Sequence, residues 1–310
     1  MTVNKTLHDL CPSAEPADVF TEIRLIVGTM AQEFNFQLLD RLHEDIQRLF
    51  TGSYPGYQAS NTKYHDLKHT YAVALATLRI LDGLHRHGQE LAPRHIELAV
   101  CCAFFHDSGL LQQEDDRQGT GAKYTIGHEE RSIKLMRDYL GRRQVTATEL
   151  EDCAQVIRCT ILSGHPRALE FHDPILATIG LVLGAADLLA QMCDRHYLEK
   201  LPDLFKEFQE GGLPGYASEM EIINKTEDFY HSVAMKRLHH DLNNIGQHVH
   251  LHFLARWGID RDLYTDGIEQ NMYYLRALKD QCSGTFECYQ KFLRRGTGNG
   301  TEKLNDQDKL

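Results

Sequence analysis

The chain has 310 residues, 42% of them hydrophobic, so it can bury one large core or two smaller ones. Lysine and arginine total 33 against 44 aspartates and glutamates, and the net charge of −11 disfavours binding to nucleic acid or to an acidic membrane surface. No basic segment followed by an apolar run opens the chain, and no stretch approaches the roughly 18 uninterrupted apolar residues of a membrane span. We therefore expect a cytoplasmic protein.

The hydrophobic periodicity is helical almost throughout the chain and predicts an all-α bundle. Residues 1–16 are expected to be disordered, and residues 17–50 are typical of two amphipathic helices or one broken helix. A loop rich in Gly, Ser and Pro follows at 51–62. Four further helices are predicted at about 66–84, from Pro93 to the Ser108-Gly109 pair, at 128–140 and at 146–162.

The later part of the chain continues the helical pattern. Residues 173–192 are apolar on almost every side, which predicts a helix buried at the centre of the bundle. More helix is expected over about 215–243 and 260–292, and disorder over the polar residues 294–310. The predicted organisation is an N-terminal helical segment at 17–63, a core at 64–200 and C-terminal helices at 201–293 that pack on the core.

The eight cysteines include no Cys-x-x-Cys pair, and several lie within apolar helical runs. This pattern favours reduced thiols that pack in the core over disulfides or a zinc ribbon.

Charged groups inside apolar helices are costly unless they are paired or bound to a metal. For an isolated Asp187, a hydrogen bond to a neighbouring backbone would be the ordinary explanation. However, six histidines and aspartates lie in or at the edge of helical runs, and imidazole and carboxylate suit zinc, iron, manganese or nickel. Six ligands exceed the four of a closed zinc site, and two ions would use them all. The six candidate metal ligands are His69, His106, Asp107, His128, His165 and Asp187.

The stretch NTKYHDLKHTYAV at 61–73 adds a second histidine, His65, four residues before His69. With the His106-Asp107 pair, the ordered set resembles the HD superfamily of metal-dependent phosphohydrolases. The stretch itself is similar to the Tyr-His-Asn-x-x-His motif of class I cyclic-nucleotide phosphodiesterases, with Asp66 in place of the asparagine. The resemblance covers about residues 60–195 and implies an HD-type bundle with N- and C-terminal helical extensions.

By this resemblance, two divalent ions (Zn, Mn, Mg or Fe) are the expected cofactors. Asp107 would bridge both ions and so take part in catalysis, because a hydroxide between two cations is a nucleophile near neutral pH. His65, one helical turn before His69 and on the same face, would be the general acid that protonates the leaving oxygen. The other ligands would be His69, His106 and Asp187 on the first ion and His128 and His165 on the second.

The predicted function is therefore a metal-dependent phosphohydrolase, a phosphodiesterase acting on a small-molecule phosphoester such as a nucleotide or cyclic nucleotide. Two alternatives stay open. Some HD-fold proteins, such as myo-inositol oxygenase, hold two irons in the same ligand order and use dioxygen, and a metal-stabilised sensor or scaffold would need no catalysis. His65 in the acid position favours hydrolysis. No nucleic-acid or membrane partner is expected, and the sequence leaves a homodimer open.

Two weaker features lie outside these motifs. The stretch QHVHLHF at 247–253 alternates histidine with apolar residues, and a metal-binding strand is one interpretation, although a solvated face is the more common one. Four basic residues near the proposed ligands could hold a phosphate, with ordinary surface charge as the default. These are Arg117, Lys123, Arg131 and Arg167.

Overall fold

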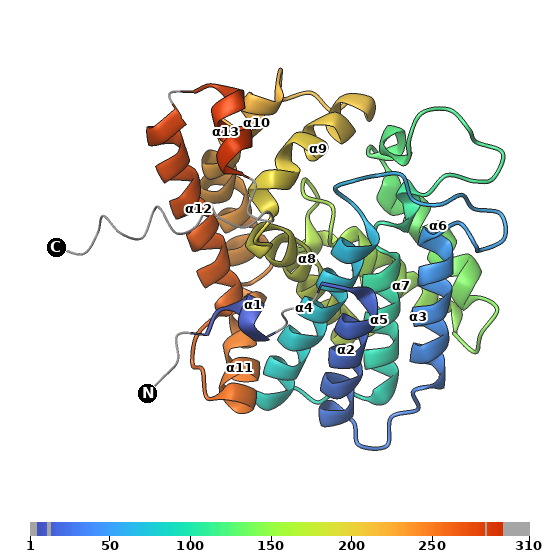
Figure 1. Ribbon diagram of the computed structural model, residues 1–310. Coiled ribbons are helices and arrows are strands. Elements are labelled where there is room, and N and C mark those ends of the chain that lie inside the picture. The colour runs from blue at the N-terminus through green and yellow to red at the C-terminus, as the bar shows by residue number, and fades with distance from the viewer. Residues whose placement is uncertain (1–4, 11–13, 283, 294–310) are drawn as a thin grey trace.

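All regular structure in the described part of the chain is helical (Figure 1). The structure, a computed structural model, describes residues 5–10, 14–282 and 284–293. These residues form thirteen α-helices and no β-strand, and one isolated antiparallel bridge joins Tyr57 to Gln113. The all-α prediction is confirmed. The expected disorder of residues 294–310 lies outside the described residues, as do residues 1–4 and 11–13, whereas Leu7–Leu10 form a short helix, α1.

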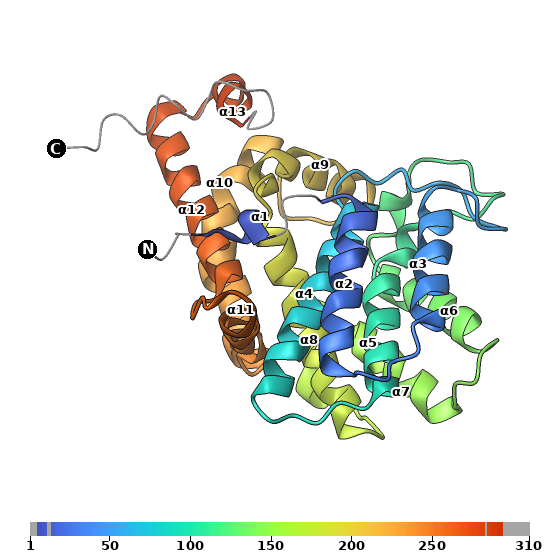
Figure 2. The same cartoon turned by 60° about the horizontal axis from the view of Figure 1, so that its bottom comes forward.

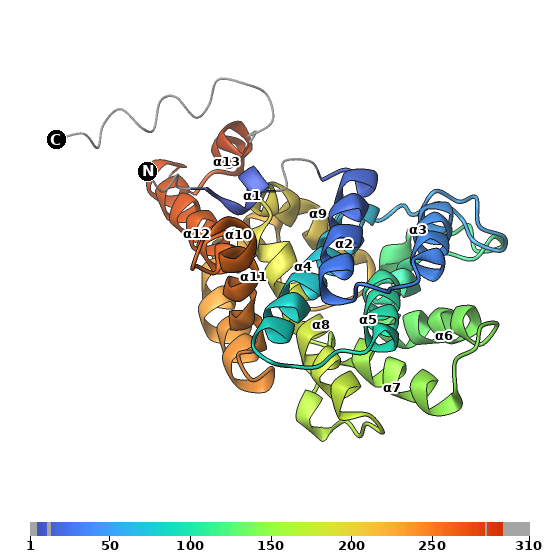
Figure 3. The same cartoon turned by 90° about the horizontal axis from the view of Figure 1, so that it is seen from below.

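Two long helices, α4 (Leu67–Arg86) and α8 (Pro174–Cys193), pack against each other at the centre of the bundle (Figures 1 and 3). Helix α8 is the one helix of the described residues that is long and apolar enough to cross a membrane. Of its most apolar 18-residue stretch, 67% is buried inside the protein. Helix α8 is therefore a helix of the protein core, whose apolar surface is covered by other helices. The predicted central helix at 173–192 is confirmed.

The remaining helices surround this central pair. Helices α2, α3, α5, α6 and α7 lie on one side and α10, α11 and α12 on the other, while α9 crosses one end of the bundle (Figures 1 and 2). Their bounds are α2 Pro16–Met30, α3 Gln37–Phe50, α5 Pro93–Phe105, α6 His128–Leu140, α7 Ala147–Arg158, α9 Tyr197–Glu210, α10 Glu219–Phe229, α11 Val249–Trp257, α12 Leu263–Cys282 and α13 Phe286–Phe292.

Besides α1, two further segments differ from the prediction. Helix α9 had no counterpart among the predicted helices, and it spans the predicted boundary between the core and the C-terminal helices. The stretch QHVHLHF is not a strand, because it forms the 3₁₀ turn Ile245–His248 and the start of α11. Its alternation of histidine and apolar residues is therefore no guide to which side chains share a face, since helical periodicity places His252 in the core and His250 near the surface.

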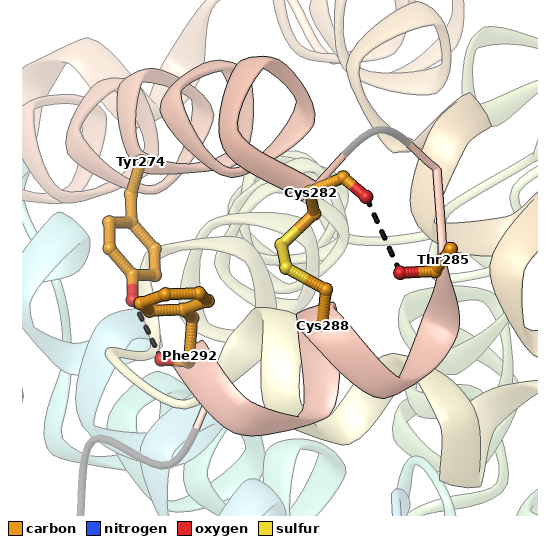
Figure 4. The surroundings of a disulfide bond; sticks show 5 residues. All are labelled: Tyr274, Cys282, Thr285, Cys288 and Phe292. Carbon is orange, nitrogen blue, oxygen red and sulfur yellow. Dashed lines mark hydrogen bonds between the residues drawn. A yellow bond between two sulfur atoms is a disulfide. The ribbon is translucent and has the colours of Figure 1, made fainter.

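A disulfide joins Cys282 at the end of α12 to Cys288 in α13 (Figure 4). The prediction of reduced thiols is wrong for this pair. The Cα atoms of the two cysteines lie 5.4 Å apart, within the range that a disulfide spans. The Tyr274 hydroxyl also donates a hydrogen bond of 2.8 Å to the Phe292 carbonyl, so two links hold α13 on α12. Five cysteines of the described residues are free.

Candidate metal centre

The first turn of α4 places His69. Asp66 is the N-cap of the helix, and its side chain accepts a hydrogen bond of 2.8 Å from the His69 backbone N–H. A carboxylate at this position satisfies a helix N–H that would otherwise lack a partner. Asp66, which stands where the resembled motif has asparagine, is thus the cap of the helical turn that carries His69.

Asp107 and His128 are brought together by a close approach of two backbones. After α5 the chain turns through His106 and Asp107 into the 3₁₀ turn Ser108–Leu110, which packs on the start of α6. A Cβ atom on Gly109 would lie 1.9 Å from the His128 carbonyl oxygen, so only glycine fits there. The Gly109 N–H also donates to the Ser132 hydroxyl at 2.8 Å, which fixes the turn against α6.

Four of the other five predicted ligands gather around Asp107. On one side, Oδ2 of Asp107 lies 3.4 Å from His69 Nε2 and 3.2 Å from His106 Nε2. On the other side, Oδ1 lies 3.2 Å from His128 Nε2. Asp187 from α8 closes the first group, with its Oδ1 3.3 Å from His69 Nε2 and 3.8 Å from His106 Nε2. One carboxylate therefore faces two separate sets of nitrogen ligands.

The sixth predicted ligand, His165, is not brought to this cluster. It is exposed and precedes the 3₁₀ turn Pro166–Ala168. Across the described residues, no hydrogen bond, ion pair or ring contact connects it to the other five. Its assignment to the second ion receives no support from the geometry, because the chain beyond α7 carries it to the surface.

The proton positions of two histidines leave a space for a cation. His106 Nδ1 lies 2.8 Å from the Ala103 carbonyl, and His128 Nδ1 lies 2.8 Å from the Thr125 carbonyl. A carbonyl only accepts hydrogen bonds, so Nδ1 carries the proton in both rings, and in the neutral ring Nε2 presents a lone pair to Asp107. Two acceptors that face each other need a proton or a metal ion between them.

Three buried atoms of the cluster make no hydrogen bond: Nε2 of His69, Nε2 of His106 and Oδ2 of Asp107. Such atoms are costly unless something binds them. One ligand atom from each of His69, His106 and Asp107 lies within 4.8 Å of the others. These three residues form a buried group that could bind a metal ion.

The electrostatics of the cluster favour positive charge. Burial by itself would lower the pKa of His69, but the facing carboxylates of Asp107 and Asp187 outweigh burial and raise it to about 10. Burial would also lower the pKa of His128, but Asp107 outweighs burial and raises this pKa to about 9. Burial would raise the pKa of Asp107, yet the adjacent His106 and the other histidines hold it well below its usual range. The field that retains protons here would also retain a metal cation.

His65 lies beside the cluster and has a partner that the sequence did not reveal. Its ring centre is 5.8 Å from that of His69 and 6.4 Å from that of His128. His65 Nδ1 is 2.6 Å from Oε2 of Glu207 in α9, whose Oε1 accepts hydrogen bonds from the backbone N–H groups of Lys63 and Tyr64. The one sequence signal for this residue is its place in α9, where it continues the apolar stripe after Leu201 and Leu204.

Comparison with known proteins adds little to this geometry. Residues 120–250 match the Npun_R2479-like family, whose description names no activity. That stretch includes His128, Asp187 and Glu207 but not His69, His106 or Asp107. No curated protein matches the chain.

Proposed function

We propose that the protein is a metal-dependent phosphohydrolase of the HD type that cleaves a phosphodiester in a small molecule, such as a nucleotide or cyclic nucleotide. The observation that carries the proposal is the juxtaposition of a histidine and carboxylate cluster with a separate histidine, His65, that is held by Glu207. A metal centre alone serves many functions, whereas a histidine oriented beside it by a carboxylate is the arrangement of a general acid.

The two oxygens of Asp107 face different histidines, and this arrangement suits two divalent ions. His69, His106, Asp187 and one oxygen of Asp107 would hold the first ion, and His128 with the other oxygen of Asp107 would hold the second. When bound, such ions lower the pKa of water and neutralise the charge that develops on a phosphoryl group.

His65 supplies the proton that the leaving oxygen needs. Because a carboxylate only accepts, the 2.6 Å contact with Glu207 places a proton on Nδ1 and leaves Nε2 at the far edge of the ring for transfer. Burial would raise the pKa of Glu207, but its bonds to His65 and to two backbone N–H groups lower it. Glu207 therefore stays ionised and keeps the His65 ring oriented with Nε2 directed away from it.

The same pair favours hydrolysis over the two alternatives. A di-iron oxygenase and a metal-stabilised scaffold would both use the ligands around Asp107. Neither needs a proton donor held 2.6 Å from a buried glutamate, since neither has to protonate an alkoxide leaving group.

The test combines metal analysis with a chromogenic diester. Protein purified without an affinity tag should contain about two equivalents of transition metal, and Asp107→Ala should lose them. His65→Ala should keep the metal and lose roughly 100- to 10,000-fold in turnover of bis(4-nitrophenyl) phosphate. His250→Ala, in the less buried part of α11, is the matched control and should behave as the parent.

Three results would contradict the proposal. A parent that contains no metal and takes up none of zinc, manganese, iron or magnesium removes the centre. Iron as the dominant metal, with uptake of dioxygen in the presence of substrate, indicates the oxygenase. Full activity in His65→Ala removes the general acid and favours the scaffold.

A further inference from the structure

Gln191 lies at the edge of the metal centre. It follows Asp187 by four residues in α8, so it lies on the same face, about 6 Å further along the helix. Its side chain is partly exposed, as is that of Asp187, while most of α8 is buried. The two side chains therefore lie on one face of α8, and both reach solvent.

Tyr64 fixes the orientation of the Gln191 amide. The Tyr64 hydroxyl donates a hydrogen bond of 2.9 Å to Oε1 of Gln191, and the Tyr64 ring meets His65 edge-on with ring centres 4.9 Å apart. Burial raises the pKa of Tyr64 well above its ordinary value, so its hydroxyl stays protonated and continues to donate. With Oε1 occupied, the amide nitrogen Nε2 is the free end of Gln191, and it makes no hydrogen bond to any described residue.

Four cationic side chains already bind other parts of the protein, while Arg117, the remaining candidate for phosphate binding, is exposed. Arg131 donates to the carbonyl oxygens of Gly109 and Leu111, Lys123 pairs with Asp116, and Lys200 pairs with Asp194 at 2.7 Å. Arg167, a further candidate for phosphate binding, donates to the His240 carbonyl and to Asn243. Gln191 thus presents an uncommitted donor that carries no charge.

We propose that the Gln191 amide donates a hydrogen bond to an oxygen of the substrate bound at the metal centre, with Tyr64 as the positioning residue that aims it. The inference rests on the proposed function and narrows its substrate class. A neutral donor contacts one more oxygen without balancing additional negative charge, so it suits a phosphodiester with a single charge better than a phosphomonoester or a polyphosphate.

The direct test replaces the donor and keeps its shape. Gln191→Glu retains an oxygen for the Tyr64 hydroxyl but replaces the NH₂ group by a second carboxylate oxygen. We expect KM for bis(4-nitrophenyl) phosphate to rise roughly 10- to 100-fold, the effect of losing a hydrogen bond to a charged group, while metal content stays at the parent level. Tyr64→Phe, which frees the amide to rotate, should raise KM in the same direction by a smaller factor. Gln270→Glu, the same exchange at an exposed position of α12, is the control and should change neither quantity.

The failure of this inference is distinguishable from the failure of the proposed function. If the parent hydrolyses the diester and Gln191→Glu keeps the parent KM, only the role of Gln191 is overturned. If the parent hydrolyses no diester, the proposed function fails. The role of the Gln191 amide is then tested alone, by calorimetric titration of manganese-loaded protein with inorganic phosphate at pH 6. Phosphate binding that is weaker in Gln191→Glu than in the parent supports the inference, and equal or absent binding overturns it.

Discussion

Helix α4 contributes to two buried clusters of histidine and aspartate, one near each end. At its N-terminal end His69 faces Asp107 and Asp187, and at its C-terminal end Asp82 accepts hydrogen bonds of 2.7 Å from His252 and 2.8 Å from Arg86. Both clusters are buried, and each contains a histidine within 4 Å of a carboxylate. They differ in their balance of charge.

Arginine accompanies only the second cluster. Within the described residues, Asp107 and Asp187 form ion pairs with histidines alone, whereas Asp82 has Arg86, and Arg79 adds positive charge near His252. Burial and Arg79 lower the pKa of His252 despite Asp82, whereas the carboxylates raise that of His69. A buried histidine–aspartate pair is therefore no sign of a metal by itself. An excess of carboxylate without a guanidinium is the informative feature.

The largest effect should come from removing that excess. Asp187→Asn takes one negative charge and one ligand from the first cluster, and we expect at least about a 100-fold loss of metal affinity, since even outer groups around metal ligands are worth 10- to 100-fold. Competition with a chromophoric chelator measures the change. Unaltered affinity in this variant would place the metal elsewhere.

Stability as a function of pH should separate the clusters by sign. In metal-free protein the pKa values of His69 and His128, about 10 and about 9, lie above the ordinary 6.5, so their stabilisation is complete below pH 6.5 and is lost as the pH rises through 9 and 10. Asp82 has a lowered pKa, so its contribution is present above pH 3.8 and is lost in acid.

Urea unfolding of chelator-treated protein between pH 6 and 10 should therefore show falling stability on the alkaline side. Metal must displace the same protons, so metal affinity should rise over this pH range. An alkaline loss that persists in an Asp107→Asn variant would assign the effect to other groups.

Breaking the second cluster should affect stability and spare the metal. Asp82→Asn leaves Arg86 and His252 without the buried carboxylate, and we expect the free energy of unfolding to fall by about 2 to 3 kcal/mol. Chemical denaturation followed by metal analysis of the folded variant checks both points. Loss of metal from folded Asp82→Asn would show that the two ends of α4 are coupled.

The smallest expected effect is a loss of stability from a site outside both clusters. It serves as a reference for the variants within them. Cys282→Ser opens the disulfide between α12 and α13, and closure of so short a loop is worth about 2 kcal/mol. Metal content should stay at the parent level, which would show that a stability loss of this size does not by itself empty the centre. The contribution of the disulfide to stability is measured by the denaturation midpoints of parent and variant, each with and without reductant. Reductant should lower the midpoint of the parent and leave that of the variant unchanged.

Much of the fold could be predicted because helical periodicity is a local property. The apolar run at 173–192 predicted the central helix α8, and the start at His128 and end at Leu140 of α6 agree with the structure. Helix α9 was not predicted, and Pro202 lies inside it, where a proline removes a helical hydrogen bond and ordinarily argues against a helix. Glu207, the residue that holds His65, lies on this unpredicted helix.

Side-chain type and order along the chain determined which residues could bind a metal. The prediction that His65 and His69 share one helix face is wrong, because α4 begins at Leu67 after its N-cap Asp66 and His65 lies in the bend before it. The tertiary structure decided which of them meet: it joined His65 to Glu207 across 142 residues, left His165 at the surface and paired Cys282 with Cys288. It also separated a cluster balanced by arginine from one that is not. The reason is physical, since periodicity follows from the backbone of one helix, whereas direction, burial and charge balance arise only when helices pack against each other.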